Sequence, residues 1–175
     1  KARYGWVAIG LHWLVALAVF ALFGLGLYMV DLGYYDPWYR SAPNLHRSVG
    51  LTLLAVVLIR VTWRVLSPPP APLASHHRWE QAGARLAHWG LLGLLLVAMI
   101  SGYLISTADG AGIPVFGLFE VPSVTGRRSG LEDSAGLVHY WSTWALVVLA
   151  GLHGLAALKH HFIDRDATLK RMLRP

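Results

Sequence analysis

Histidine supplies most of the chemistry available to this sequence, which contains nine histidines and no cysteine. His139 and His153 are fourteen residues apart within one long apolar run. On an α-helix, at about 100° and 1.5 Å per residue, this spacing puts both imidazoles on nearly the same face and about 21 Å apart along the axis. Two metal sites stacked along one helix require such an arrangement.

Four apolar runs, at about residues 6–30, 45–66, 77–106 and 135–162, carry most of the histidines. Of the 175 residues, 55% are hydrophobic and 14% are charged. Continuous apolar runs of this length are typical of transmembrane helices. The first run is too long for a signal peptide and lacks a cleavage site of small residues, so we expect a retained anchor. We predict an all-α membrane protein with a single domain over residues 1–175, a four-transmembrane-helix bundle.

Prolines and polar residues predict where these helices begin. Asn44, after Pro43, is a candidate N-cap for the second helix, and Ser75 is one for the third. The longest loop follows the third helix and contains an apolar stretch, residues 113–119, too short to span a membrane. We expect this stretch to lie in the outer membrane interface or to plug the mouth of the bundle.

The distribution of lysine and arginine predicts the orientation. With four spans both chain ends lie on one side, and that side holds most of the basic residues, which identifies it as cytoplasmic. The net charge of +6 then reflects topology and contact with anionic lipids rather than nucleic-acid binding. The inner basic residues are Lys1, Arg3, Arg64, Arg78, Arg85, Lys159, Arg165, Lys170, Arg171 and Arg174, and the outer ones are Arg40, Arg47, Arg127 and Arg128.

The histidines fall at two depths in the predicted bundle. His46 and His139 lie within about 3 to 6 Å of the outer boundary, counting the rise from the outer end of each helix. His12 and His153 lie about 27 Å from the outer ends, near the inner boundary. His88 lies at the same inner depth, so spacing leaves open whether His12 or His88 partners His153. A single membrane histidine often only binds a neighbouring carbonyl, but four at matched depths favour a ligand role.

Paired histidines in an apolar core are typical of metal or haem sites. Zinc usually takes four protein ligands, and carboxylates or thiolates that would complete its shell are missing from these helices. Haem needs only two axial ligands, and the lack of cysteine excludes thiolate ligation and covalent attachment. The pattern therefore predicts two stacked b-type haems with six-coordinate iron, suited to electron transfer. Glycines that offer room for the porphyrin, or for ordinary helix packing, are Gly24, Gly26, Gly50, Gly136, Gly151 and Gly154.

Two arginines are candidates for binding haem propionates. Arg60 is fourteen residues after His46, so it lies on the same face at the inner level. It either holds an inner propionate or extends to the cytoplasmic headgroups. Arg47 is a candidate at the outer level, where Arg40 and the pair Arg127 and Arg128 are alternatives.

A polar rim below the inner pair predicts a quinone site. His88, Lys159 and His160 offer hydrogen-bond donors and a proton source near an electron donor. The alternative, which the sequence favours, is that Lys159, His160 and His161 are simply the basic end of the last helix. We expect His76 and His77 to be solvated.

Together these motifs resemble the bacterial cytochrome b561 family. The resemblance covers nearly the whole chain and implies a four-helix dihaem cytochrome b of the cytoplasmic membrane. It also implies that His12 and His153 bind the inner haem iron and His46 and His139 the outer. The segments that carry it are Gly10-Leu11-His12-Trp13-Leu14, Asn44-Leu45-His46-Arg47-Ser48-Val49-Gly50, Leu86-Ala87-His88, Phe116-Gly117-Leu118, Val138-His139, His153 and His160-His161-Phe162.

The resemblance implies electron transfer between a donor at the outer face and ubiquinone or menaquinone. Some family members are superoxide:ubiquinone oxidoreductases, so superoxide is a candidate donor, although the outer loops carry more acidic than basic residues. An alternative is a quinone-reactive subunit that anchors a larger dehydrogenase or hydrogenase-type partner protein in the lipid bilayer. A second alternative is a histidine-dependent transporter, which would be colourless.

Overall fold

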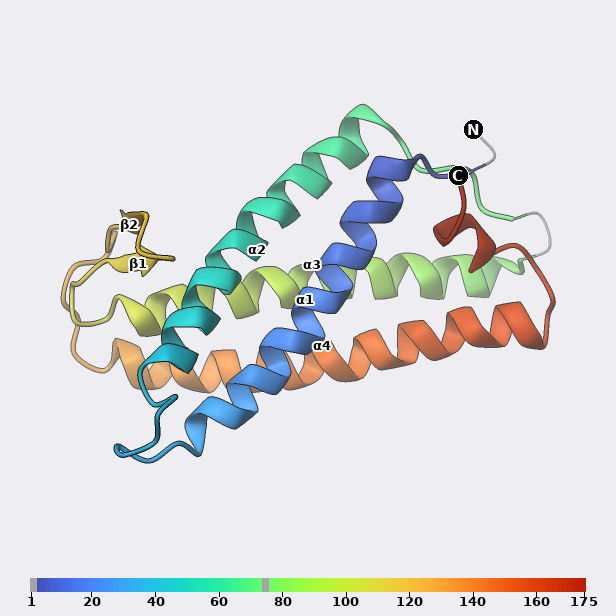
Figure 1. The fold of residues 1–175 in the computed structure, drawn as a ribbon. Coiled ribbons are helices and arrows are strands. Elements are labelled where there is room, and N and C mark those ends of the chain that lie inside the picture. Colours follow the sequence, from blue (N-terminus) through green and yellow to red (C-terminus); the bar gives the residue numbers. More distant parts are fainter. Residues whose placement is uncertain (1–2, 74–75) are drawn as a thin grey trace.

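Four long helices make up most of the chain in the computed structural model, which describes residues 3–73 and 76–175 (Figure 1). They are α1 (Trp6–Val30), α2 (Ser41–Leu66), α3 (Arg78–Ser106) and α4 (Leu131–Phe162). Each is long and apolar enough to cross a membrane. The predicted four-transmembrane-helix architecture is therefore confirmed.

Two helices begin earlier than the sequence predicts. Helix α2 starts at Ser41, so Pro43 lies in its first turn. Proline is tolerated there because first-turn N–H groups have no carbonyl acceptor within the helix, and the missing N–H therefore costs no hydrogen bond. Asn44 is consequently not the N-cap but lies inside the helix, where its Oδ1 accepts a hydrogen bond from Arg47 Nη2 at 2.8 Å. Helix α4 starts at Leu131 rather than near residue 135. The predicted cap Ser75 lies outside the described residues, and His77 is the N-cap of α3.

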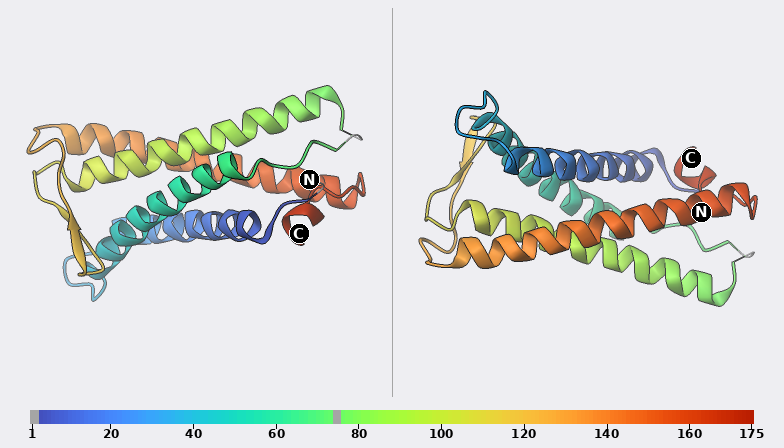
Figure 2. Two further views of the ribbon diagram at one scale, coloured as in Figure 1. Left: turned by 90° about the horizontal axis from the view of Figure 1, so that it is seen from above. Right: turned by 90° about the horizontal axis from the view of Figure 1, so that it is seen from below.

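The helices pack as two pairs, α1 with α2 and α3 with α4. Figure 2 shows the pairs as two layers that cross obliquely. Helices α3 and α4 have 29 and 32 residues, and at about 1.5 Å per residue they exceed the roughly 30 Å thickness of a hydrocarbon core. At least one end of each must therefore project beyond the apolar layer.

A small apolar cluster joins the pairs halfway along the bundle. Leu53 and Leu146 belong to this cluster, and Leu146 is seven residues from both His139 and His153. Most other large apolar side chains on the helices are exposed, as expected where lipid replaces water as the solvent. The buried members are Val15, Val19, Leu53, Val57, Leu95 and Leu146.

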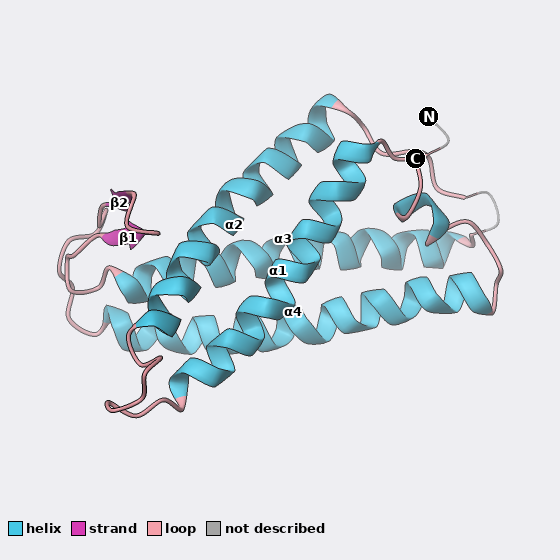
Figure 3. Ribbon diagram, in the orientation of Figure 1, coloured by secondary structure: helices cyan, strands magenta, loops and turns pink. Residues whose placement is uncertain are grey.

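A β-hairpin closes one end of the bundle, between α3 and α4 (Figure 3). Strands β1 (Ile113–Val115) and β2 (Phe119–Val121) are antiparallel, with Val115 opposite Phe119. The apolar stretch predicted to lie in the interface or to plug the bundle is thus a hairpin. It packs on α2, where Ser48 Oγ accepts a hydrogen bond from the backbone N–H of Phe116 at 3.0 Å.

The two ends of the described chain meet at the opposite end of the bundle. Arg3 Nη1 donates to the carbonyl of Pro175 at 3.2 Å, and Trp13 Nε1 donates to the carbonyl of Met172 at 2.7 Å. Four crossings bring both ends to one side, as an even number of spans requires.

Candidate functional site

The outer pair consists of His46 from α2 and His139 from α4, whose ring centres are 6.3 Å apart with ring planes at 80°. His139 Nδ1 lies 2.8 Å from the carbonyl oxygen of Ala98 on α3. Because a carbonyl only accepts, Nδ1 carries the proton and donates it, which leaves Nε2 with a free lone pair. The carbonyl thus holds His139 in the tautomer that binds a metal through Nε2.

Both outer imidazoles lie against a glycine of the neighbouring helix. A Cβ at Gly26 of α1 would lie 3.3 Å from His46 Cε1. A Cβ at Gly102 of α3 would lie 3.1 Å from His139 Cε1. Both values are shorter than ordinary van der Waals contact, so each ring occupies a slot that a larger residue would narrow.

The inner pair consists of His12 from α1 and His153 from α4, whose ring centres are also 6.3 Å apart, with planes at 69°. Arg60 of α2 is half-buried beside this pair, and its Nη2 lies 3.2 Å from His12 Nδ1. The guanidinium is thus at the inner level and directed into the bundle, on the face predicted from its spacing to His46.

His88 of α3 lies beside the same inner pair. Its ring centre is 5.2 Å from that of His153, with planes at 69°. The structure therefore brings three histidines from three helices together at the inner level, His12 and His88 both neighbouring His153.

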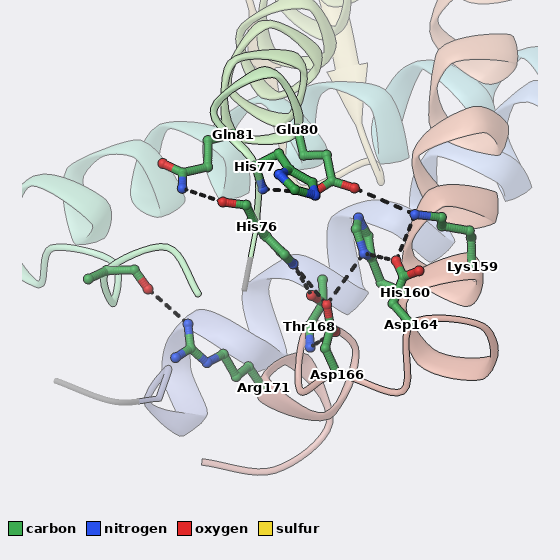
Figure 4. A network of polar contacts seen from close by, with 11 residues as sticks. His76, His77, Glu80, Gln81, Lys159, His160, Asp164, Asp166, Thr168 and Arg171 are labelled. Atoms are coloured by element: carbon green, nitrogen blue, oxygen red, sulfur yellow. Dashed lines mark hydrogen bonds and ion pairs between the residues drawn. The ribbon is translucent and has the colours of Figure 1, made fainter. Parts of the chain in front are cut away.

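The other two quinone-site candidates, Lys159 and His160, lie among carboxylates (Figure 4). Lys159 Nζ is 2.7 Å from Asp164 Oδ2 and 3.5 Å from Glu80 Oε1. His160 Nδ1 is 2.7 Å from Asp164 Oδ2. His88 is eight residues from Glu80 on α3, about 12 Å along the axis, so the structure separates it from these two residues.

His76 is not solvated, contrary to expectation. Its Nε2 lies 2.8 Å from Asp166 Oδ2, and its side chain is 16% exposed. Burial opposes ionisation of Asp166, yet hydrogen bonds from Thr168 and His76 outweigh it and lower the pKa of Asp166 to about 2. The segment after α4 folds back onto the residues before α3, which no local pattern indicates.

The cationic candidates at the outer face make mainly local contacts. Arg47 Nε donates to the carbonyl of Pro43 at 3.3 Å, within the first turns of α2. Arg127 pairs with Asp109 through a backbone bridge, and the Arg128 N–H donates to the Ala108 carbonyl at 3.0 Å.

Comparison with known proteins places this arrangement in a family. A model of the prokaryotic cytochrome b561 family matches residues 3–175. The chain is 53% identical over 171 residues to cytochrome b561 homolog 2 of Escherichia coli (strain K12), covering 98% of this chain and 91% of that protein. The chain belongs to the prokaryotic cytochrome b561 family.

Two further relatives match over almost their full length. The chain is 29% identical over 172 residues to the probable superoxide oxidase CybB of Yersinia pestis, covering 98% of this chain and 96% of that protein. It is 26% identical over 183 residues to cytochrome b561 homolog 1 of Escherichia coli (strain K12), covering 98% and 97%. As a member of the cytochrome b561 family, the protein is a multi-pass bacterial membrane protein that transfers electrons with b-type haem.

The histidine pairs of this b561-family chain fit the axial ligation of haem. Two imidazoles on opposite sides of one metal ion, with metal–nitrogen bonds of about 2 Å, have ring centres about 6 Å apart. His12–His153 and His46–His139 both show this separation, whereas the 5.2 Å between His88 and His153 is shorter. Within the described helices, no Asp or Glu lies within five residues of any of these four histidines along the chain.

Sequence reasoning missed the groups that orient His139. Ala98, Ser101 and Gly102 were not singled out, because nothing in the side chains of Ala98 or Gly102 indicates chemistry. The sequence feature that indicates these groups is Ser101-Gly102, a polar residue followed by a small one inside an apolar run. Ser101 Oγ lies 3.4 Å from His139 Nδ1.

Proposed function

We propose that this chain binds two b haems and conducts electrons across the bacterial inner membrane. His46 and His139 hold the outer haem, and His12 and His153 hold the inner one. The observation that carries the proposal is the repeated 6.3 Å separation at two levels of one bundle, with both levels sharing α4. Iron held by two imidazoles exchanges single electrons without an open coordination site.

The residues around the ligands favour stable ferric and ferrous states. The Ala98 carbonyl keeps His139 oriented, which minimises movement when the charge changes. Arg60 lies beside His12 with five N–H donors and no acceptor, so it cannot accept the Nδ1 proton of an Nε2-bound imidazole. We infer that Arg60 turns from His12 to an inner propionate, an anionic partner that it can bind in a bidentate manner. Arg47 is the outer counterpart.

The apolar cluster lies between the two histidine pairs, and none of its side chains is polar. Leu53, Leu95 and Leu146 are each less than 10% exposed, and they come from three helices. Such a layer excludes water, so electrons pass between the levels while protons do not.

We propose that the electron donor acts at the outer face and a quinone accepts electrons at the inner side. In the superoxide version, two superoxide anions lose one electron each and leave as O₂. One ubiquinone or menaquinone gains both electrons and two protons from the inner side and leaves as quinol. The relative described as a probable superoxide oxidase supports superoxide as the donor.

His88 is the quinone-site candidate nearest the inner pair. An imidazole beside His153 offers a hydrogen bond to a quinone carbonyl and a group that can transfer a proton. Lys159 and His160 form the polar inner edge of the site, about 12 Å further along the helices. The quinone headgroup therefore contacts His88, and Lys159 and His160 lie towards the cytoplasm.

Haem stoichiometry tests the ligand assignment. We expect two haems per chain in the purified protein, one in His12→Ala and two in His88→Ala, measured by the reduced spectrum and iron content per protein. His77→Ala, which removes an exposed histidine, is the matched control and should keep both. Loss of a haem in His88→Ala but not in His12→Ala would reverse the inner assignment, and a colourless wild-type protein would remove the electron-transfer proposal.

Activity separates a stand-alone enzyme from an anchoring subunit. We expect superoxide-dependent quinone reduction by the purified protein, and a rate at least tenfold lower in His88→Ala with both haems retained. Reduction only after a co-purified partner is added would favour the quinone-reactive subunit of a larger complex. No rate above the spontaneous reaction, with or without a partner, would exclude superoxide as the donor.

A further inference from the structure

A cluster of histidines and carboxylates lies at the end of the bundle where the chain ends meet, apart from the haem ligands (Figure 4). Its members come from three segments: His76 precedes α3, His160 lies in the last turn of α4, and Asp164 and Asp166 follow α4. The ligand atoms of His76, His160 and Asp166 all lie within 4.8 Å of one another. The proposed electron path uses neither His76 nor the two aspartates.

The distances in this cluster are close to those between the ligands of a small metal ion. Ligands about 2.0–2.2 Å from a tetrahedral zinc ion lie about 3.3–3.6 Å from each other. Asp166 Oδ2 is 2.8 Å from His76 Nε2 and 3.4 Å from His160 Nδ1. Small shifts would therefore convert these pairwise contacts into one coordination shell.

The backbone brings both aspartates to the same imidazole. Arg165, between them, has φ of 54° in the left-handed region, which is uncommon for a residue other than glycine. The chain reverses at this residue, and both carboxylates then face His160 Nδ1, Asp164 at 2.7 Å and Asp166 at 3.4 Å.

The surroundings hold the ligands in place and favour a cation. The Thr168 N–H donates to Asp166 Oδ1 at 2.7 Å, which leaves Oδ2 for the metal, as outer partners of ligating carboxylates do. Gln81 Nε2 donates to the backbone carbonyl of His76 at 3.0 Å. Within the network of Figure 4, three carboxylates, those of Glu80, Asp164 and Asp166, outnumber the two cationic side chains of Lys159 and Arg171.

We propose that His76, His160 and Asp166 bind a divalent transition-metal ion, with a water molecule in the fourth position. Two imidazoles and carboxylate oxygens are a donor set typical of zinc, and the geometry does not provide the six or more oxygens that calcium takes. The Lys159 ammonium is paired with Asp164 and Glu80, which lie outside this set of three ligands. The ion ties the segment before α3 to the end of α4.

Metal analysis of the holoprotein tests this site without relying on electron transfer. The protein is purified in detergent, treated with EDTA, titrated with Zn²⁺ and analysed for zinc and iron in one sample. We expect one zinc per chain in the wild type. Binding should weaken at least tenfold in His76→Ala and in Asp166→Asn, with the iron content unchanged.

His77→Asn is the matched control, because it removes the neighbouring exposed imidazole while asparagine still caps α3. It should bind zinc as the wild type does. Thr168→Val is a milder second variant. It keeps the three ligands and the backbone N–H that donates to Asp166, but it removes the hydroxyl 3.2 Å from His76 Nε2, and it should weaken binding less than His76→Ala does. Absence of zinc from the wild type at about tenfold excess, or equal binding by His76→Ala and His77→Asn, would overturn the proposal. Because iron is counted separately, either result leaves the haem proposal standing.

Discussion

At the scale of single residues, groups without reactive side chains position the histidines that we propose as haem ligands. The carbonyl of Ala98 sets the tautomer of His139, and Gly102 gives its ring room beside α3. Gly26 of α1 likewise leaves room for the ring of His46. A histidine at the right depth is therefore only one requirement, because the neighbouring helix must also leave room for the ring, and for His139 it also supplies the acceptor.

Gly102→Ala tests this requirement. The new Cβ would lie 3.1 Å from His139 Cε1 and 3.2 Å from Nδ1, so the ring must shift by some tenths of an ångström. We expect the outer haem to be bound less tightly and the haem content per chain to fall from two towards one. Gly93→Ala in the same helix meets nothing within 4 Å and should retain both haems. Equal haem content in the two variants would show that the slot has no role.

At the scale of elements, the β-hairpin shows how a short apolar segment is positioned by a helix. Phe116 and Gly117 both have positive φ, as the central residues of tight hairpin turns do. Two strands of three residues are too short to be stable alone. Ser48, 3% exposed and two residues after His46, supplies the contact with α2. The hairpin is thus attached next to the outer pair.

Ser48→Ala is expected to loosen the hairpin. It leaves the N–H of Phe116 without its acceptor and removes the contact with the Pro114 carbonyl, at a cost of about 1–3 kcal/mol. Hydrogen exchange of the amides from residue 113 to 121 should become faster. Thr52→Ala is the control, because the Thr52 hydroxyl donates only to the Ser48 carbonyl of its own helix. Unchanged exchange in Ser48→Ala would mean that apolar packing alone holds the hairpin.

At the scale of the whole molecule, the arrangement of charge and of chain ends defines two faces. Arg3 lies beside Pro175 at one end, and the hairpin lies at the other. Basic residues are concentrated towards the end that holds the termini, so we propose that this face is cytoplasmic. A donor at the outer face and a quinone near His88 then lie on opposite sides of the apolar cluster.

Single cysteines can test this orientation, since the chain has none of its own. Val124 is 79% exposed in the connection between α3 and α4, and Leu173 is 50% exposed near the C-terminus. A membrane-impermeant maleimide added to intact spheroplasts should label Val124→Cys and should label Leu173→Cys only after lysis. The reverse labelling pattern would invert the proposed direction of electron flow.

Much of this arrangement follows from local regularities. The four helices are predicted because apolar runs of this length have few other stable states, and a regular helix fixes the angle and rise between residues. The level of Arg60 relative to His46 follows from the same regularity, and the structure places its guanidinium 3.2 Å from His12. The first residue of a helix does not follow from these regularities. Pro43, for example, is compatible both with the first turn of α2 and with the loop before it.

The sequence by itself determined the four spans, the two depths of histidine and the family likeness, because each depends on residue type and helical period. Only the tertiary structure decided which groups meet across helices. It gave His139 the carbonyl of Ala98, put His88 beside His153, and brought His76 to Asp166, ninety residues away. Such contacts depend on how helices cross and where the chain turns back, and helical period alone contains neither.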